Sequence, residues 1–429
     1  MYAPPSTGGP RPRRVAIVLS GGGARGAYEV GVLWYVFEEL ARLRGGPPRI
    51  DILCGTSVGA INACYIAAHL FDPGLGIRRL VELWSELEIT RVLGFGMRQL
   101  ITIPRLLTGG GEHGAGLFDV RPMAELVQKE VSWRAVSRAL QSKQLSALSV
   151  STTEVSTGRT VVFMQLAPDM VVPSPPPPRT LFQAELIGPQ HALASAAIPL
   201  IFPAVRIDGE LYLDGGLRQN TPIAPALRLG ASHIFVVGSS RHVSGIAASE
   251  APTATTAKAP GAAFLLGKVL NAFLLDHVDV DLELLRRLNG VLTDGTSAYG
   301  PGFTNTLSEE SKKRGGPDYS YVQNLTVRPS EDIGHVASEH VKRGSFRGDP
   351  FLTKRLFSLL DSGVGDEADL ASYIMFDGPF CRRMIEMGRS DARARRDELL
   401  AFFGDRSVDE GTSGEGITDF ASGGFAIGT

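Results

Sequence analysis

Two stretches of the chain decide its fold: residues 15–26 read VAIVLSGGGARG, and residues 50–59 read IDILCGTSVG. Each begins with a short apolar run of the kind that forms a buried parallel strand. Each then enters a glycine-rich turn and continues into a segment with helical periodicity. Strand, tight turn and helix, twice over, predict an α/β sheet whose active groups lie at the carboxyl ends of the strands.

The rest of the chain extends this pattern to a three-layer α/β sandwich with a mostly parallel central sheet and a largely helical C-terminal region. We expect further strands at 145–151, 160–166, 234–238 and 319–327, a hairpin at 205–213, and helices at 24–43, 60–70, 74–88, 192–197, 222–229, 264–288, 351–360 and 370–403. Residues 90–118 are irregular and glycine-rich, which is typical of a lid or surface loop.

Composition excludes several classes of function. The 43 Lys and Arg residues balance 45 Asp and Glu, so no excess of cations favours nucleic-acid binding. No apolar run approaches the roughly 18 residues of a spanning helix, and residues 1–14 do not resemble a signal peptide. Three cysteines (Cys54, Cys64 and Cys381) form neither a disulfide framework nor a metal motif, which favours a cytoplasmic protein.

The first candidate for chemistry is Ser57. Residues 55–59 fit the pattern G-x-S-x-G, with Gly55 and Gly59 flanking the serine between a predicted strand and a predicted helix. Such a sharp turn projects the hydroxyl outward, and the helix N-terminus adds partial positive charge for an oxyanion. The alternative is a plain tight turn, because this short pattern often arises by chance in a glycine-rich chain.

The glycine run at residues 21–26 has two interpretations. Its consecutive amides can point into one concavity that binds an anion. Gly21, Gly23 and Gly26 satisfy the dinucleotide pattern G-x-G-x-x-G, but that fold also requires an acidic residue about 20 positions further on. Glu38 and Glu39 are too near and lie in the predicted helix. An oxyanion hole for Ser57 is therefore favoured.

Asp214 is a candidate base for the serine. It follows the predicted hairpin, and Gly215 and Gly216 leave space around it. A hydroxyl nucleophile needs a base within hydrogen-bond reach at neutral pH. The alternative is a turn aspartate that hydrogen-bonds its own backbone. Spacing alone does not choose between the two.

Two histidines are rival bases. The chain order Ser57, Asp214, His233 is that of α/β-hydrolase triads. His233, however, begins a buried strand, which predicts a place at the opposite end of the sheet. His191 begins a helix of small residues. Each is more commonly a structural histidine than a catalytic one.

Together these residues resemble the patatin-like phospholipases, over about residues 14–238. Three motifs occur in the family's order: residues 21–26, residues 55–59, and Asp214-Gly215-Gly216. Residues 194–199, Phe202-Pro203, Asn220, Pro222 and Gly230-Ala231 are also similar to the family's pattern.

The resemblance implies a Ser–Asp dyad without histidine, and hydrolysis of phospholipids or other lipid esters through an acyl-enzyme. Ser57 would be the nucleophile and Asp214 the base, with no metal or other cofactor. The amides of Gly22, Gly23, Ala24 and Arg25 would form the oxyanion hole; Gly21, Gly26, Gly55, Gly59, Gly215 and Gly216 would complete the motifs. Arg25 would brace the loop or attract an anionic headgroup, and bracing is favoured by its place in the first helical turn.

Within this interpretation, a catalytic domain is expected over 14–244, a flexible linker over 245–263, and a mainly helical region packed on the catalytic domain over 264–405. Residues 1–13 and 406–429 are expected to be disordered. Peripheral membrane contact is expected of a lipid hydrolase. Residues 100–107 are one candidate for it, whereas the apolar positions of 264–278 fit a core face better.

Two alternatives share these motifs: a thioesterase or small-ester hydrolase with the same dyad, and a lipid-binding regulator whose site is vestigial. A further difficulty concerns the base. An ordinary aspartate has a pKa of about 3.9, which makes it weaker than an ideal base by about 4 kcal/mol unless burial raises the pKa. We therefore hypothesise that the oxyanion amides supply much of the acceleration.

Overall fold

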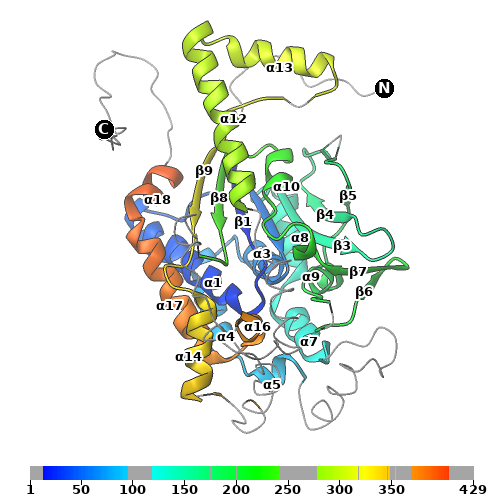
Figure 1. The fold of residues 1–429 in the computed structure, drawn as a ribbon, viewed down its shortest axis with the longest axis vertical. Coiled ribbons are helices and arrows are strands. Elements are labelled where there is room, and N and C mark those ends of the chain that lie inside the picture. The colour runs from blue at the N-terminus through cyan, green and yellow to red at the C-terminus, as the bar shows by residue number, and fades with distance from the viewer. Residues whose placement is uncertain are drawn as a thin grey trace, which may run out of the picture.

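A computed structural model places one large sheet at the centre of the molecule (Figure 1). It describes residues 13–94, 118–241 except 174, 175 and 200, 278–347 except 317 and 345, residue 353, and residues 369–404. The strands are β1 (Val15–Leu19), β2 (Ile52–Thr56), β3 (Ala147–Glu154), β4 (Thr160–Leu166), β5 (Thr180–Ala184), β6 (Val205–Ile207), β7 (Glu210–Asp214), β8 (His233–Val237) and β9 (Gln323–Val327).

The strand order is β5-β4-β3-β2-β1-β8-β9, and the hairpin β6–β7 joins through β3. The five strands from β3 to β9 along this order are parallel to one another, whereas β4 and β7 are antiparallel to β3. The sheet is therefore mostly parallel, as predicted. Because β9 pairs with β8, the C-terminal part of the chain contributes a strand to the central sheet.

Helices cover both faces of the sheet. They are α1 (Gly26–Trp34), α2 (Ala41–Arg44), α3 (Val58–Ala68), α4 (Pro73–Ser85), α5 (Ile89–Val92), α7 (Arg121–Glu130), α8 (Trp133–Gln141), α9 (Pro189–Ser195), α10 (Ile223–Arg228), α12 (Val278–Tyr299), α13 (Phe303–Lys313), α14 (Ile333–Arg343), α16 (Asp369–Ile374), α17 (Gly378–Ala394) and α18 (Arg396–Phe403). A 3₁₀ turn, η1 (Gly23–Arg25), precedes α1, and a π-helical stretch, η2 (Tyr35–Leu40), joins α1 to α2.

Alternation along β1 divides the core into two layers. Val15, Ile17 and Leu19 pack with residues of α1, α3, α4 and α17, whereas Ala16 and Val18 pack with residues of α10 and α12. This is the period-2 pattern of a strand that is buried on both faces. The three-layer architecture is thereby confirmed.

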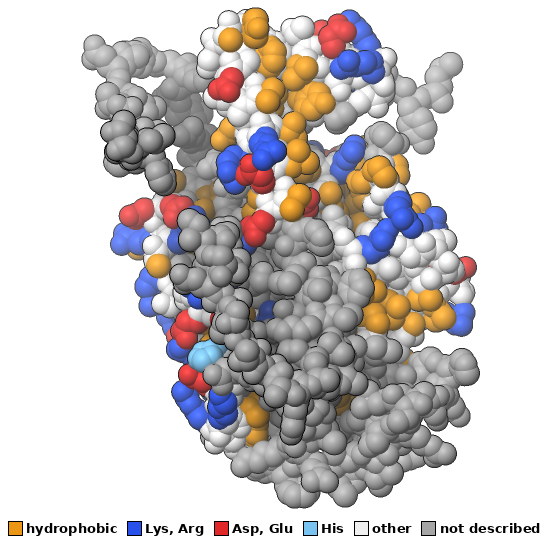
Figure 2. Space-filling model, in the orientation of Figure 1, with side chains coloured by type: hydrophobic (Ala, Val, Ile, Leu, Met, Phe, Trp, Pro, Cys, Tyr) orange, Lys and Arg blue, Asp and Glu red, His pale blue; other side chains and the backbone are white. Residues whose placement is uncertain are grey.

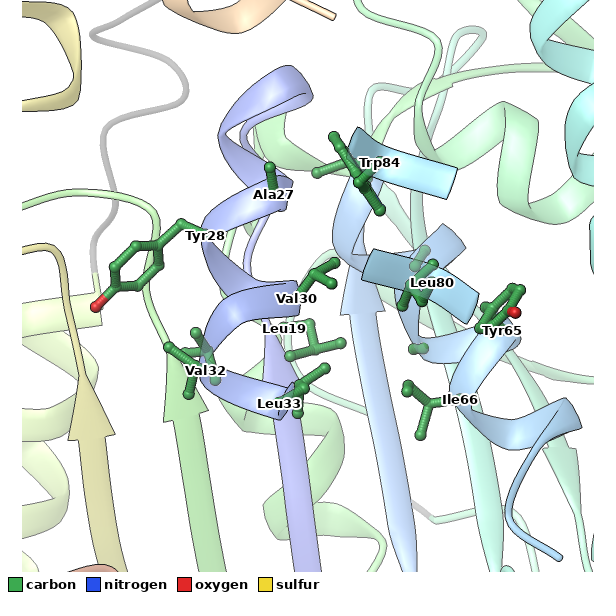
Figure 3. Close-up of a cluster of buried hydrophobic side chains, with 14 of the residues drawn as sticks. Leu19, Ala27, Tyr28, Val30, Val32, Leu33, Tyr65, Ile66, Leu80 and Trp84 are labelled. Atoms are coloured by element: carbon green, nitrogen blue, oxygen red, sulfur yellow. The ribbon is translucent and has the colours of Figure 1, made fainter. Parts of the chain in front are cut away.

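Helix α1 packs against α3 and α4 through a cluster of buried side chains (Figure 3). Val30 and Leu33 of α1 lie close to Ile66 of α3 and Leu80 of α4, and Trp84 lies beside the start of α1. Tyr28 points away from this cluster. Burial of large side chains contributes about 1.5–3 kcal/mol each, so this cluster fixes α1 and the glycine run before it.

The strand at 15–19 and the strand at 160–166 lie where they were predicted. Helix α12 continues to Tyr299 instead of ending at residue 288, since the first strong breaker is Gly300-Pro301. The helix expected over 370–403 is three helices, because Gly378-Pro379 begins a new one and Asp377 is extended.

Several elements were not predicted: β5, α7, α8, α13 and α14. The expected irregular segment at 90–118 begins with the end of α5. The predicted linker at 245–263, the apolar patch at 100–107, the predicted helix at 351–360 apart from Thr353, and the expected tail at 406–429 lie outside the described residues.

Helix α12 leads to α13 at one end of the molecule, and hydrophobic side chains run along its exposed face (Figures 1 and 2). These are Val280, Leu284, Leu288 and Val291. Within the described part of the chain, none of the helices combines the length and the apolar composition needed to span a bilayer.

Helices α1 and α17 approach each other backbone to backbone. A Cβ at Gly388 of α17 would overlap the carbonyl oxygen of Tyr28, and a Cβ at Gly31 of α1 would overlap that of Ile385. Backbone atoms cannot yield as the end of a flexible side chain can. The contact between α1 and α17 therefore depends on these two glycines.

We expect Gly388→Ala to lower the free energy of unfolding by about 1–3 kcal/mol, through overpacking between the helices. Gly290→Ala in α12 is the matched control, because a Cβ there meets nothing within 4 Å. It should be neutral or stabilising by up to about 1 kcal/mol. Urea denaturation of both variants tests this, and equal stability of the two would contradict it.

Candidate active site

Strand β3 brings Ser57 and Asp214 together. Its residue Ser151 pairs with Thr56 at the end of β2, and its next residue, Thr152, pairs with Asp214 at the end of β7. Strand β2 is parallel to β3 and β7 is antiparallel, so the two run toward each other along one edge of β3. Two side chains 157 positions apart in the sequence thereby meet.

Ser57 occupies a strained turn between β2 and α3. Its φ of 55° lies in a region that residues other than glycine rarely adopt. Its amide donates to Ser195 Oγ at 2.8 Å, and Ser195 Oγ donates to the carbonyl of Ser151 at 2.6 Å. A Cβ at Gly59 would collide with the carbonyl oxygens of Leu19 and Ser20, so this glycine permits the close passage of β1.

The carboxylate of Asp214 is fully buried and reaches the serine directly. Ser57 Oγ donates to Asp214 Oδ2 at 2.6 Å, and the amide of Gly216 donates to Oδ1 at 2.7 Å. Burial raises the pKa of Asp214 to about 7, although both hydrogen bonds favour its ionised form. A carboxylate with such a pKa is well matched to accepting a proton at neutral pH.

The glycine run lies beside this pair. A Cβ at Gly21 would be 3.0 Å from that of Ser57, and Gly23, at a φ of 55°, lines the same pocket as Ser57. Gly23 and Ala24 are the first residues of η1, where amides lack carbonyl partners within the helix. The amide of Arg25, by contrast, already donates to the carbonyl of Gly22 at 3.1 Å. The amides of Gly22, Gly23 and Ala24 are therefore the stronger candidates for holding an anion.

Asn220 and Ser239 hold the start of this loop. The amide of Gly21 donates to the carbonyl of Asn220 at 3.0 Å, and Asn220 Nδ2 donates back to the Gly21 carbonyl at 3.2 Å. Ser239 Oγ donates to the same carbonyl at 2.6 Å. From the sequence, Asn220 and Ser195 could be recognised only by their resemblance to the family's pattern, because their hydrogen-bond partners are distant in the chain.

An apolar pocket opens from Ser57. It encloses about 770 Å³, counting the open space at its mouth. One side follows the face of α3 that carries Val58, Ile61, Asn62 and Tyr65, and leucines and valines of α4 and α7 form much of the rest. This apolar lining is typical of a site for a largely apolar ligand.

Neither histidine serves this pair. His191 Nδ1 accepts from the amide of Gly188 at 2.9 Å, its ring lies edge-on to Phe163, and burial lowers its pKa to about 4. His233 pairs with Val15 at the amino end of β1, which confirms its predicted place at the opposite end of the sheet from Ser57.

The comparison with protein families identifies this arrangement. Residues 17–227 match the model of the patatin-like phospholipase family. These residues form a patatin-like phospholipase domain. The patatin-like domain contains most of β1, all of β2 to β7, the turn at Ser57, Asp214 and the glycine run.

Related proteins share this domain over part of their length. A "cGAMP-activated phospholipase" of Pseudomonas aeruginosa is 32% identical over 212 residues, which cover 48% of this chain and 53% of that protein. A "probable lipid hydrolase 463L" of Invertebrate iridescent virus 6 is 23% identical over 218 residues, covering 49% and 63%. The chain thus spans about half the length of the Pseudomonas protein.

Among solved structures, VipD from Legionella pneumophila is similar with a TM-score of 0.33 and 12% identity, covering 90% of this chain and 67% of that one.

The buried carboxylate of the patatin-like domain predicts a pH-dependent stability. In the unfolded chain Asp214 ionises near a pKa of about 3.9, whereas in the folded protein its pKa is about 7. Between these values the folded state binds more protons, so the free energy of unfolding falls as pH rises. Asp214→Asn removes this dependence and keeps the shape of the side chain.

We expect Asp214→Asn to be more stable than the wild type above pH 7, by on the order of 2–4 kcal/mol, and the difference to disappear near pH 4. Urea denaturation of both proteins between pH 4 and 8 measures it. A difference that does not vary with pH would show that the carboxyl group is not desolvated.

Proposed function

We propose that the protein is a lipid acyl hydrolase that cleaves carboxylic esters through an acyl-enzyme. The observation that carries the proposal is the 2.6 Å hydrogen bond from Ser57 Oγ to Asp214 Oδ2, at the end of an apolar pocket in a patatin-like domain. The names of the related proteins, a phospholipase and a probable lipid hydrolase, support the same class of substrate.

In the first half of the reaction, Ser57 Oγ attacks the ester carbonyl carbon while its proton passes to Asp214 Oδ2. Negative charge develops on the carbonyl oxygen, and the amides of Gly22, Gly23 and Ala24 stabilise it. Collapse of this intermediate breaks the bond to the alcohol, which leaves with the proton from Asp214. The acyl group is then bonded to Ser57.

In the second half, Asp214 removes a proton from water, and the resulting hydroxide attacks the acyl-enzyme. The fatty acid leaves, and Ser57 Oγ recovers its proton from Asp214. The carboxyl group alternates between base and acid, which requires a pKa near the working pH. The raised pKa of Asp214, about 7, supports this role.

The pocket supports an acyl chain as the part of the substrate that is recognised. Its lining is almost wholly aliphatic and aromatic, so it offers burial rather than hydrogen bonds to the group beside Ser57. A phospholipid or related lipid ester, met at a membrane surface by a protein of the cytoplasm, fits this chemistry. A thioesterase or small-ester hydrolase would use the same dyad, and a vestigial binding protein would keep the pocket without turnover.

A fluorophosphonate probe tests the nucleophile. We expect it to label the wild type but neither Ser57→Ala nor Asp214→Asn. Hydrolysis of a phospholipid, an acyl-thioester and a short-chain ester by the wild type should favour the phospholipid. Its kcat/KM should rise with pH to a plateau above a midpoint near 7, because Asp214 must be ionised to accept a proton. An unlabelled wild type would indicate a binding protein instead.

A second experiment addresses the oxyanion loop. Gly23→Pro removes one amide and imposes a φ near −65° where the loop has 55°. We expect kcat to fall by more than about 10²-fold, the usual cost of losing one oxyanion donor. Gly45→Pro is the matched control. Gly45 also has a positive φ, but it follows the end of α2, whereas Gly23 precedes α1. Equal kcat in the two variants would contradict the role of the loop.

A further inference from the structure

The glycine run is contacted by a segment outside the patatin-like domain. Arg25 Nε donates to Ser372 Oγ of α16 at 2.8 Å, and its guanidinium lies 4.1 Å from the ring centroid of Tyr373. The carbonyl oxygen of Tyr373 lies against Gly23, so closely that a Cβ at Gly23 would overlap it. Helix α16 therefore contacts the loop both through a side chain and through the backbone.

The burial of Arg25 makes these contacts strong constraints. Its side chain is 5% exposed, and a guanidinium removed from water requires hydrogen-bond or aromatic partners close to it. Ser372 and Tyr373 supply one of each. Because Arg25 is itself the last residue of η1, its fixed side chain fixes the orientation of the two residues before it, Gly23 and Ala24.

The chain just after α16 is anchored at two consecutive residues, Asp377 and Gly378. The carboxylate of Asp377 accepts from the Arg347 amide at 2.7 Å and contacts His340 Nε2 at 2.8 Å. The amide of Gly378 donates to the carbonyl of Leu87 at 2.9 Å, and a Cβ at Gly378 would overlap the carbonyl oxygen of Ser85. The segment is thus bound to the patatin-like domain at the end of α4, next to the pocket.

The same segment contributes to the wall of the pocket. Phe376 lines it together with Leu87 and Trp84, and the ring centroids of Trp84 and Phe376 are 6.2 Å apart. The substrate pocket is therefore not formed by the patatin-like domain alone. One aromatic side chain comes from about 150 residues beyond the end of that domain.

We propose that residues 369–378 complete the active site: Ser372 and Tyr373 are positioning residues that hold the oxyanion loop through Arg25, and Phe376 determines how the acyl chain is bound. The inference rests on the proposed function for its effect on turnover. Its structural half, the hold on the loop, does not depend on turnover. This gives the C-terminal part of the chain a role in catalysis.

Two pairs of variants of the full chain test the hold on the loop. Ser372→Ala removes the hydroxyl that accepts from Arg25. Ser308→Ala in α13 is its control, because Ser308 is also buried and hydrogen-bonded, but α13 lies at the other end of the molecule from α16 (Figure 1). Tyr373→Leu removes the ring beneath the guanidinium, and Tyr373→Phe retains it.

For turnover we expect Ser372→Ala and Tyr373→Leu to lower kcat by about tenfold and to change KM by less than about twofold, as expected when only transition-state stabilisation is weakened. Tyr373→Phe should lower kcat less than Tyr373→Leu, because it retains the ring, and Ser308→Ala should keep the kcat of the wild type. Phe376→Ala should instead raise KM for a long-chain ester several-fold more than for a short-chain ester.

Amide hydrogen exchange gives a readout that needs no activity. The amides of residues 22–25 should exchange at least about tenfold faster in Ser372→Ala and Tyr373→Leu than in the wild type or Ser308→Ala. Unchanged exchange, or a kcat loss in Ser308→Ala equal to that in Ser372→Ala, would overturn the proposal. If the wild type were inactive but the exchange rates were as expected, the proposed hydrolase function would be wrong, whereas the positioning of the loop by Ser372 and Tyr373 would stand.

Discussion

The meeting of β2 and β7 along one edge of β3 is the constraint on which the rest of the site depends. Successive residues of β3, Ser151 and Thr152, pair with the ends of the two strands. A shift of either register by one residue would turn the side chains to the opposite face of the sheet. The short contact between Ser57 and Asp214 is therefore a property of the whole sheet, and it is supported by β2 and β3, which are buried along their whole length.

The burial that aligns the pair also sets its acidity. An aspartate exposed to water has a pKa far below neutral pH, and so weak a base would leave most of the proposed acceleration to the oxyanion amides. Full burial instead raises the pKa of Asp214 to about 7, so the base is closer to ideal than its residue type suggests. In the proposed mechanism, the base and the amides then share the acceleration more evenly. As a consequence, above pH 7 the folded state has a lower free energy of unfolding than it would have with a neutral side chain at this position.

The sequence was sufficient to predict the parts of the site that are local in the chain. Glycine spacing around Ser57 and after Leu19 places turns at the ends of strands, and the hairpin ending at Asp214 is readable from its turn residues. The pKa of Asp214 and the contacts of Ser195 and Asn220 could not be predicted, because they depend on residues distant in the chain, such as Ser57, which lies 138 positions from Ser195, and Gly21, which lies 199 positions from Asn220. The amphipathic helices α7, α8, α13 and α14 were not predicted, although α14 carries readable signals: Asp332 caps its start, and Gly344 ends it in a left-handed conformation.

The contact between α16 and the glycine run shows that a motif can contain all of its residues and still not determine the orientation of its amides. The run GGGARG supplies flexible backbone and, at Gly22, Gly23 and Ala24, the candidate amides for an anion, yet flexibility alone would leave those amides pointing in many directions. Arg25 is the residue in the run with a long side chain, and its contacts with Ser372 and Tyr373 convert that flexibility into one orientation. The glycines allow the close approach of Tyr373, and the arginine makes use of it. In the proposed site, the oxyanion loop is therefore held jointly by two regions that the sequence separates by almost 350 residues.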